Sequence, residues 1–593
     1  MSKGYIISAV IFFVGALVAT LLVYHYYTKN SSRKMNIYCR CCHIITLYTC
    51  MVPFPLLTLD VDSALDVHDH PEHGKETWME VIWIIIFAIS YIFGWVILPI
   101  AEAYTEVGDF TVKRAILHAI KVNLKLYLIA AGIVISLFIY IMISKGLYTS
   151  TSNILSLAIS LANTWGLLML IVFMPDGLVG VPRTLWRYAN PRKMLYTILL
   201  RVIDIQEELD FASMDLGSIK AELIEVDQLV MDEKQSYLHQ MLESISEADR
   251  EIPLYHTAAQ RIRPKTVTRD RADVSLQHLE DLNKRLKYSI KMVNRANYRW
   301  KSTLRLCRLL DLTIRGVDNT NNPIKKVWIS IRQYVYLMGC GITTILTVLI
   351  LWSEMVLPFR ELTSKPLGPI ELLMHSSMHF VISNVLLFYM VYCAYWAVFR
   401  FKMFNAYTIY PGIADNSSLC FNETFLIRLL MPLSFNFLLI SGLSNSDTGV
   451  DVMYGHVYRR NMDVSILLGK GVNQFFPLLI PFVATVVFFN LMGRILNLMG
   501  IEVYNIGDIK SSEMRQRLID GRKLVEAELG YALVGAVLPG EEPIFNGINN
   551  SGLASDTASH GKNGSNVRGQ RYREYLEKRG GIQPEKDTEN TTV

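Results

Sequence analysis

The chain has 593 residues, of which 51% are hydrophobic and only 19% are charged, and its net charge is +5. In a soluble protein of this length about one quarter of the residues are charged, so the apolar excess indicates that part of the chain lies in a lipid bilayer. The eight cysteines show no regular spacing, which argues against the disulfide framework of a small secreted protein.

Apolar runs long enough to cross a membrane recur along the chain. A hydrocarbon core of about 30 Å requires about 20 residues of helix. The first run begins at Tyr5 and has neither a charged n-region nor a clear cleavage site, so we interpret it as a retained span. The second is the weakest, because it is short and contains Pro53 and Pro55. The nine predicted spans are 5–27, 43–59, 79–101, 126–145, 153–174, 331–357, 372–399, 425–442 and 475–498.

Alternate loops between these spans differ in charge. The loops after spans one, three, five and seven contain the basic residues Lys29, Arg33, Lys34, Arg40, Lys113, Arg114, Lys121, Lys125, Arg183, Arg187, Arg192, Lys193, Arg400 and Lys402. Lysine and arginine in short loops mark the cytoplasmic side, so we expect an extracellular or lumenal N-terminus and a cytoplasmic C-terminus. Arg459 and Arg460, before span nine, are the exception.

This orientation makes a prediction for the glycosylation sequons, all of which fall on the cytoplasmic side. We therefore expect them to be unmodified, and a glycan at Asn416 or Asn422 would contradict the orientation. The sequons begin at Asn30, Asn416, Asn422, Asn549, Asn563 and Asn590.

Between the fifth and sixth spans the hydropathy falls and a heptad pattern appears. Apolar residues alternate at spacings of four and three, which predicts a cytoplasmic coiled coil; they are Ile198, Val202, Ile205, Leu209, Ala212, Leu216, Ile219, Leu223, Val226 and Val230. This stretch is acidic, whereas a second helical stretch over about 276–315 is basic. Opposite charge favours an antiparallel hairpin of the two; the alternative is that the basic face lies on anionic lipid.

The predicted organisation is an all-α polytopic membrane protein in five parts. These are an N-terminal bundle of five spans (1–180), the coiled-coil domain (181–325), a C-terminal bundle of four spans (326–500), a juxtamembrane amphipathic segment (501–540) and a tail (541–593). The tail is rich in glycine, asparagine, serine and charge, and we expect it to be disordered.

Several stretches resemble one family. The run from Asn163 to Leu170, followed by Gly177-Leu-Val-Gly-Val-Pro-Arg-Thr-Leu-Trp186, is similar to the signature that closes the fifth span in the limb-region-1 and lipocalin-interacting membrane receptor family. Trp352-Ser-Glu354, the runs 398–405, 433–438 and 494–500, and Gly521-Arg-Lys-Leu also fit. The resemblance covers about residues 1–530 and is closest to the limb-region-1 domain-containing protein 2 branch.

The resemblance implies a nine-span protein of the plasma membrane, with an endolysosomal membrane as the alternative. It also implies that the protein modulates signalling by a G-protein-coupled receptor of the adrenergic type. Our main hypothesis is a non-enzymatic receptor or adaptor whose coiled coil binds partner proteins. The alternative function is a transporter, or a receptor for a small ligand or a lipocalin-like carrier, that uses polar residues in spans six to nine.

Polar residues inside spans are costly and often functional. The candidates for a polar ligand cavity are Glu354, His375, His379, Asn384, Arg428 and Asn436. The structural interpretation, which we favour, is that they form hydrogen bonds between helices. Arg428 and Asn436 lie eight residues apart, and we expect them to share a helix face.

Two sets of side chains have the composition of a zinc site. Glu371, His375 and His379 recur every four residues, and the loop that follows span two contains His68, His70 and His73. The spacing is not that of a zinc protease, and a solvated polar loop is the interpretation that we favour, so no metal is assigned.

Three cysteines, Cys39, Cys41 and Cys42, lie beside a span on the cytoplasmic side, where palmitoylation occurs; unmodified thiols are the alternative. The chain contains no Gly-x-Ser-x-Gly elbow, Walker A loop or dinucleotide-binding loop. We expect no enzyme activity and no cofactor. Because the basic helix is tethered to a membrane, we expect its acidic partner to be lipid or protein, not nucleic acid.

Overall fold

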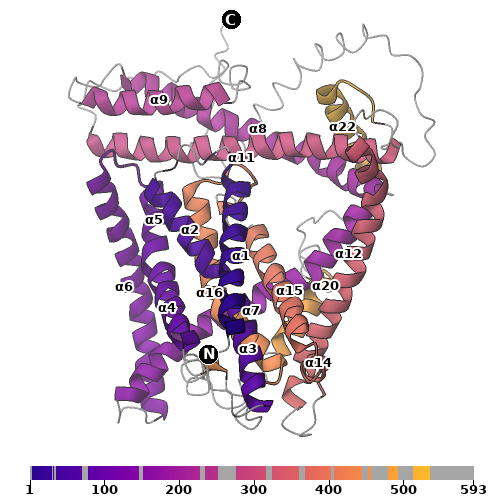
Figure 1. Cartoon of the computed structure of the whole chain (residues 1–593). Coiled ribbons are helices and arrows are strands. Elements are labelled where there is room, and N and C mark those ends of the chain that lie inside the picture. The colour runs from indigo at the N-terminus through magenta and orange to yellow at the C-terminus, as the bar shows by residue number, and fades with distance from the viewer. Residues whose placement is uncertain are drawn as a thin grey trace, which may run out of the picture.

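The computed structural model describes residues 3–29, 31, 35, 37–69, 78–145, 151–227, 234–251, 275–315, 323–359, 367–401, 407–443, 452–455, 478–491 and 512–533. Within these ranges the regular elements are all helices, and none of them is a strand (Figure 1). The predicted all-α, multi-pass architecture is confirmed.

Seven helical stretches in the described residues are long and apolar enough to cross a membrane. They are Tyr5–Thr28, Ile37–His68, Trp78–Glu106, Thr164–Ala189, Val327–Phe359, His379–Arg400 and Asn416–Ile440. The fourth predicted span lies within α6 (Val112–Lys145), and the ninth overlaps α20 (Leu479–Phe488). The count of nine stays a prediction.

Four spans differ most from their predicted bounds. The fifth does not end at position 174, because its helix, α7 (Thr151–Ala189), extends further and includes Arg183 and Arg187. The second consists of α2 (Ile37–Met51) and α3 (Pro53–Asp69), because a proline in the first turn of a helix starts it without losing a hydrogen bond. The seventh divides into α14 (Pro369–Met374) and α15 (His379–Arg400). The eighth, α16 (Asn416–Ile440), begins nine residues earlier than position 425.

Helix α7 contacts α15, α16, α20 and α12 (Pro323–Val356) and, less extensively, α6. The approach to α15 is close, since a Cβ atom on Gly177 would lie 2.0 Å from the carbonyl oxygen of Cys393. Small residues permit such backbone contact between membrane helices. The glycine-containing run 177–186 therefore has a packing role at the centre of the bundle.

Outside the bundle, α8 (Pro191–Asp227) and α11 (Leu276–Arg315) pack against each other. Arg285 pairs with Glu222 at 3.0 Å, and Arg299 pairs with Glu208. The numbering rises along one helix as it falls along the other, so the pair is antiparallel. Of the predicted heptad residues, Val202, Ile205, Leu209, Leu216, Ile219, Leu223 and Val226 are buried there. Pairing within the chain therefore occurs, while knobs-into-holes packing stays a prediction.

Two further helices complete this unit, which we call the hairpin domain (α8, α9, α11 and α22). Helix α9 (Gln235–Glu251) contacts both α8 and α11. Helix α22 (Ser512–Leu529) lies on α8 so closely that a Cβ on Gly521 would be 2.1 Å from the carbonyl oxygen of Leu199. The amphipathic segment near the C-terminus thus packs on the hairpin through its apolar face.

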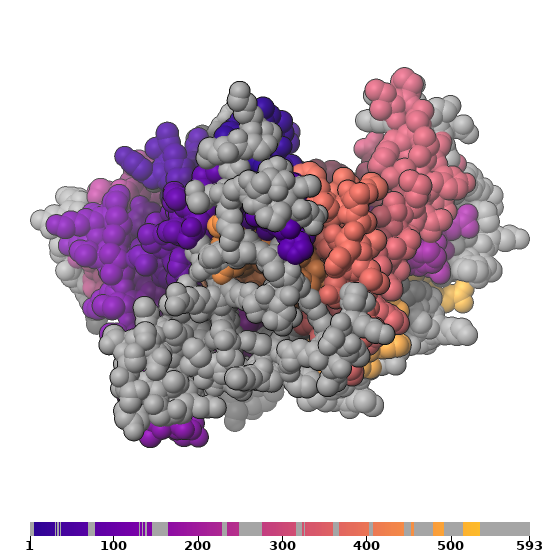
Figure 2. All heavy atoms as spheres, turned by 60° about the horizontal axis from the view of Figure 1, so that its bottom comes forward, coloured from indigo at the N-terminus to yellow at the C-terminus, as the bar shows by residue number. Residues whose placement is uncertain are grey.

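The hairpin domain lies across one end of the membrane helices, at the top of Figure 1. Helix α1 (Lys3–Thr28) points toward α11, and α2 leads away from it. Figures 1 and 2 show the same order across the molecule, with α6 at one edge, α12 at the opposite edge, and α1 and α15 between them. The described ends of the basic loops after spans one and three lie beside the hairpin domain, since Lys29 lines a cavity with α11 and Gly108 accepts from Asn283.

Candidate functional site

The predicted cavity residues do not converge on one site. Glu354 of α12 and Asn436 of α16 do meet, and the amide of Asn436 donates to Glu354 Oε1. Both side chains are buried, and Met174 Sδ lies 3.8 Å from the same amide nitrogen. The amide of Asn436 thus connects α16 to α12 and α7.

The other polar candidates have separate partners. Nε2 of His379 lies 3.0 Å from Asp62, and Asn384 accepts from the hydroxyl of Thr58 at 3.1 Å. His375 is exposed, and its ring contacts the carbonyl of Glu371 in its own helix. These contacts are interhelical or local hydrogen bonds, as the structural interpretation expected.

The expectation that Arg428 and Asn436 share a face is wrong. Arg428 donates to the carbonyl of Gly94 at 3.1 Å and lies over the ring of Trp95, whereas Asn436 points to α12. Eight residues advance a helix by about 80° beyond two full turns, and Pro432 lies between the two positions. They therefore reach different neighbours.

Among the described residues, no three His, Cys, Asp or Glu side chains are placed to hold a metal ion. His70 and His73 lie outside those residues. Cys39, Cys41 and Cys42 are free thiols in the first turns of α2, with Cys41 exposed and the other two half-buried. Their palmitoylation stays a prediction.

The contact that joins the hairpin domain to the bundle was missed in the sequence. Asp415 precedes α16. Its carboxylate forms ion pairs with two cations of α11, Lys291 Nζ at 3.1 Å and Arg295 Nη2 at 2.8 Å. The hydroxyls of Ser417 and Ser418 also donate to its carboxylate. Burial raises the pKa of Asp415, but the two cations and two hydroxyls outweigh it, and the pKa lies well below its usual range.

This ion-pair cluster continues into the membrane bundle. Asn416 Oδ1 accepts from Nε2 of His43 at 2.6 Å, and Nδ1 of the same ring lies 2.8 Å from Glu423. His43 and Glu423 are fully buried. One chain of polar contacts therefore runs from α11 through the start of α16 to α2.

A second contact joins α11 to the loop between α5 (Leu98–Glu106) and α6. The carbonyl of Gly108 accepts from Asn283 at 2.7 Å, and that of Val107 accepts from Lys287 at 3.0 Å. A Cβ on Gly108 would lie 1.8 Å from the carbonyl of Glu280, so only glycine fits this approach. Burial lowers the pKa of Lys287, and the nearby negative charge of Asp109 opposes this lowering in part.

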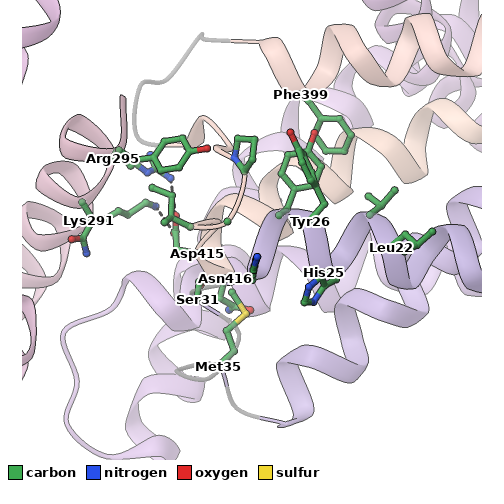
Figure 3. A pocket seen from close by; sticks show the side chains of 18 of the residues that line it. Leu22, His25, Tyr26, Ser31, Met35, Lys291, Arg295, Phe399, Asp415 and Asn416 are labelled. Atoms are coloured by element: carbon green, nitrogen blue, oxygen red, sulfur yellow. Dashed lines mark hydrogen bonds and ion pairs between the residues drawn. The ribbon is translucent and has the colours of Figure 1, made fainter. Parts of the chain in front are cut away.

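A large cavity opens between this face of α11 and the ends of α1 and α15. It encloses about 1720 Å³, more than the about 300–1,000 Å³ of a typical small-molecule site. Figure 3 shows Lys291, Arg295 and Asp415 at one end and Leu22 at the other. None of the six predicted polar residues lines it. The basic run of α11 was visible in the sequence, but the α1 and α15 walls come from distant segments.

Comparison with known proteins identifies relatives over most of the chain. A family model described as LMBR1-like membrane protein matches residues 4–492. The G-protein coupled receptor-associated protein LMBRD2 of Caenorhabditis briggsae is 24% identical, over 75% of this chain and 72% of its own. The LMBR1 domain-containing protein 2 homolog of Drosophila melanogaster is 25% identical over 77% and 71%, and the human G-protein coupled receptor-associated protein LMBRD2 is 21% identical over 76% and 68%. No solved structure gives a significant match.

Proposed function

Because the chain belongs to the LMBR1-like membrane protein family, we propose that it is a multi-pass membrane adaptor that associates with a G-protein-coupled receptor. The names of its relatives support association with a receptor of this class. Within the proposal, the receptor is of the adrenergic type, the membrane is the plasma membrane, and the hairpin domain is cytoplasmic.

The observation that carries the proposal is the way the hairpin domain is held. One side of α11 faces the acidic helix α8, and another faces the bundle through Lys291, Arg295 and Asn283. Helices anchored on two sides present their remaining surface in a fixed orientation, and such preorganisation lowers the entropic cost of binding. A partner in the same membrane would meet this surface at the end of the bundle.

The outward surface of α9 is the part of the hairpin domain that we assign to the partner. Its inward residues Leu238, Met241 and Ile245 are buried in the domain, whereas His239, Leu242 and Glu243 are exposed, among other residues. The other described helices of the domain do not cover these exposed side chains, so they are available to a partner.

The test is a triple variant, His239→Ala, Leu242→Ala and Glu243→Lys, expressed as full chain in cells. We expect it to reach the membrane normally and to lose co-purification with, and proximity labelling of, the receptor. The matched control replaces three exposed residues of α22, Arg515, Gln516 and Asp520, by alanine. Retained association of the α9 variant would overturn the assignment of the surface, and absence of any receptor near the wild-type chain would overturn the proposed function.

A further inference from the structure

The cavity between α11, α1 and α15 has a basic wall and an apolar wall. The described residues that line it include six cationic side chains and one carboxylate. The cations are Lys29, Lys287, Lys291, Arg295, Lys301 and Arg305. All but the first lie on α11, so the positive charge is gathered on the wall that faces the end of the bundle.

Four of these six cations already have partners within the protein, since Nε of Arg305 donates to the carbonyl of Lys301 and its guanidinium lies over the ring of Tyr298. Lys291 and Arg295 pair with Asp415, and Lys287 donates to a backbone carbonyl. Lys301 and Arg305 are exposed on the cavity side of α11 and form no ion pair with a described residue. They are therefore available to a ligand with negative charge.

The opposite walls are apolar and belong to membrane-spanning helices. Leu22 of α1 is 65% exposed, and Phe388 and Tyr392 of α15 are 71% and 50% exposed. All three line the cavity. Along α1 the lining changes toward α11, from Leu22 to His25 (Figure 3) and then to Lys29, whereas α15 contributes aromatic side chains from Phe388 to Phe399.

This gradient matches the order of groups in a phospholipid. Acyl chains are stabilised against apolar side chains at membrane depth, while headgroup phosphates attract lysine and arginine at the surface. A small soluble anion would use the basic wall only and would leave the exposed apolar wall unexplained. The size of the cavity, about 1720 Å³, also exceeds what such an anion needs.

We propose that this cavity is a specific site for an anionic phospholipid, with phosphatidylserine as the probe, entering from the leaflet on the hairpin side. Lys301 and Arg305 bind the anionic groups of the headgroup, and the acyl chains lie between α1 and α15. The lipid fills the space between bundle and hairpin domain. The proposal is independent of receptor association.

The experiment uses the full chain reconstituted in phosphatidylcholine vesicles that contain a minor fraction of phosphatidylserine with a photoactivatable acyl chain. After illumination, we expect cross-linked peptides from α1 and α15. Unlabelled phosphatidylserine should compete, whereas phosphatidylcholine, glycerophosphoserine and inorganic phosphate should not. Cross-links spread evenly over α6 and α12 would overturn the site, and equal competition by the two soluble anions would overturn the lipid as its occupant.

Variants then test the basic wall. Lys301→Gln with Arg305→Gln should weaken phosphatidylserine labelling about 20- to 30-fold, since each basic side chain contributes about fivefold to attraction for anionic lipid. The matched control, Lys284→Gln with Arg308→Gln, removes the same charge from exposed positions of α11 that do not line the cavity. An equal effect of both variants would mean non-specific surface attraction and would overturn the proposal, as would an unchanged Lys301/Arg305 variant.

Discussion

Asp415 joins α11 to the membrane bundle through ion pairs. Removing its carboxylate takes away the anion that both Lys291 and Arg295 contact, and the Arg295 side chain is only 7% exposed. Loss of one partner from a fully buried pair costs about 3–5 kcal/mol, and Asp415 is itself partly exposed. We therefore expect Asp415→Asn to lower the free energy of unfolding by about 2 kcal/mol.

The measurement for Asp415→Asn is the thermal midpoint of the full chain in detergent. Asp227→Asn, at an exposed position at the end of α8, is the control and should change little. A midpoint for Asp415→Asn equal to that of the wild type would show that the cluster does not stabilise the junction.

The low pKa of Asp415 also fixes how its contribution depends on pH. A carboxyl whose pKa is lower in the folded than in the unfolded chain stabilises the fold above the unfolded pKa, near 3.8, and loses that effect as pH falls below it. We expect the difference in midpoint between wild type and Asp415→Asn to be constant from about pH 8 to pH 5 and to shrink below about pH 4. A difference that shrinks already between pH 7 and pH 5 would contradict the lowered pKa.

Glu354 and Asn436 make a different kind of polar contact, buried among membrane helices. Glu354→Gln keeps the acceptor for the Asn436 amide and removes the need to bury a charge, so we expect stability equal to or above wild type. Asn436→Leu removes the donor and should lower the free energy of unfolding by about 2 kcal/mol. If Glu354→Gln proved as destabilising as Asn436→Leu in thermal unfolding, the pair would require an ionised carboxylate.

At the scale of elements, the contact between α7 and α15 depends on the absence of a side chain. A methyl group at Gly177 would overlap the carbonyl of Cys393, and the two backbones would have to separate. We expect Gly177→Ala to lower the free energy of unfolding by about 3 kcal/mol or to prevent accumulation of folded protein. Size-exclusion chromatography after a heating series measures this.

The control for that contact is Gly341→Ala on α12. A Cβ there meets no atom within 4 Å, and alanine favours helix over glycine by about 1 kcal/mol. We expect unchanged or slightly raised stability. An equal loss of stability in Gly177→Ala and Gly341→Ala would mean that helix flexibility, not close packing, explains the glycine at 177.

At the scale of the whole molecule, the predicted orientation, with the hairpin domain in the cytoplasm, can be tested by glycosylation. Asn422 is a poor reporter, because its side chain is buried and donates to the carbonyls of Tyr407 and Ser418. Asn416 is similarly engaged with His43. Absence of a glycan at either position therefore has a packing explanation and leaves the orientation untested.

Sequons introduced at new positions avoid this difficulty. We expect one placed between α3 and α4 (Trp78–Ile92) to be glycosylated and one placed between α8 and α9 to remain unmodified. A glycosidase-sensitive shift in gel mobility reports the result in cells. The reverse pattern would place the hairpin domain outside the cell or in the lumen.

The sequence by itself determined the class of this protein, because a bilayer imposes long apolar runs and a heptad pattern imposes a buried stripe, and both are local in the chain. It located α8, α11 and α22 and the seven apolar stretches, and the packing of α8 on α11 followed from their opposite charges. It misjudged the ends of the second and eighth spans, where prolines start helices and polar residues such as Ser417 and Glu423 are buried.

Only the tertiary structure decided where the polar residues meet. Nothing in the sequence links Asp415 to Lys291 and Arg295, or His43 to Glu423; the packing of α11 and α16 brings these side chains together. The cavity likewise combines α1, α11 and α15, which are far apart in the chain. Periodicity and charge are properties of one segment, whereas a site is a property of how distant segments are packed together.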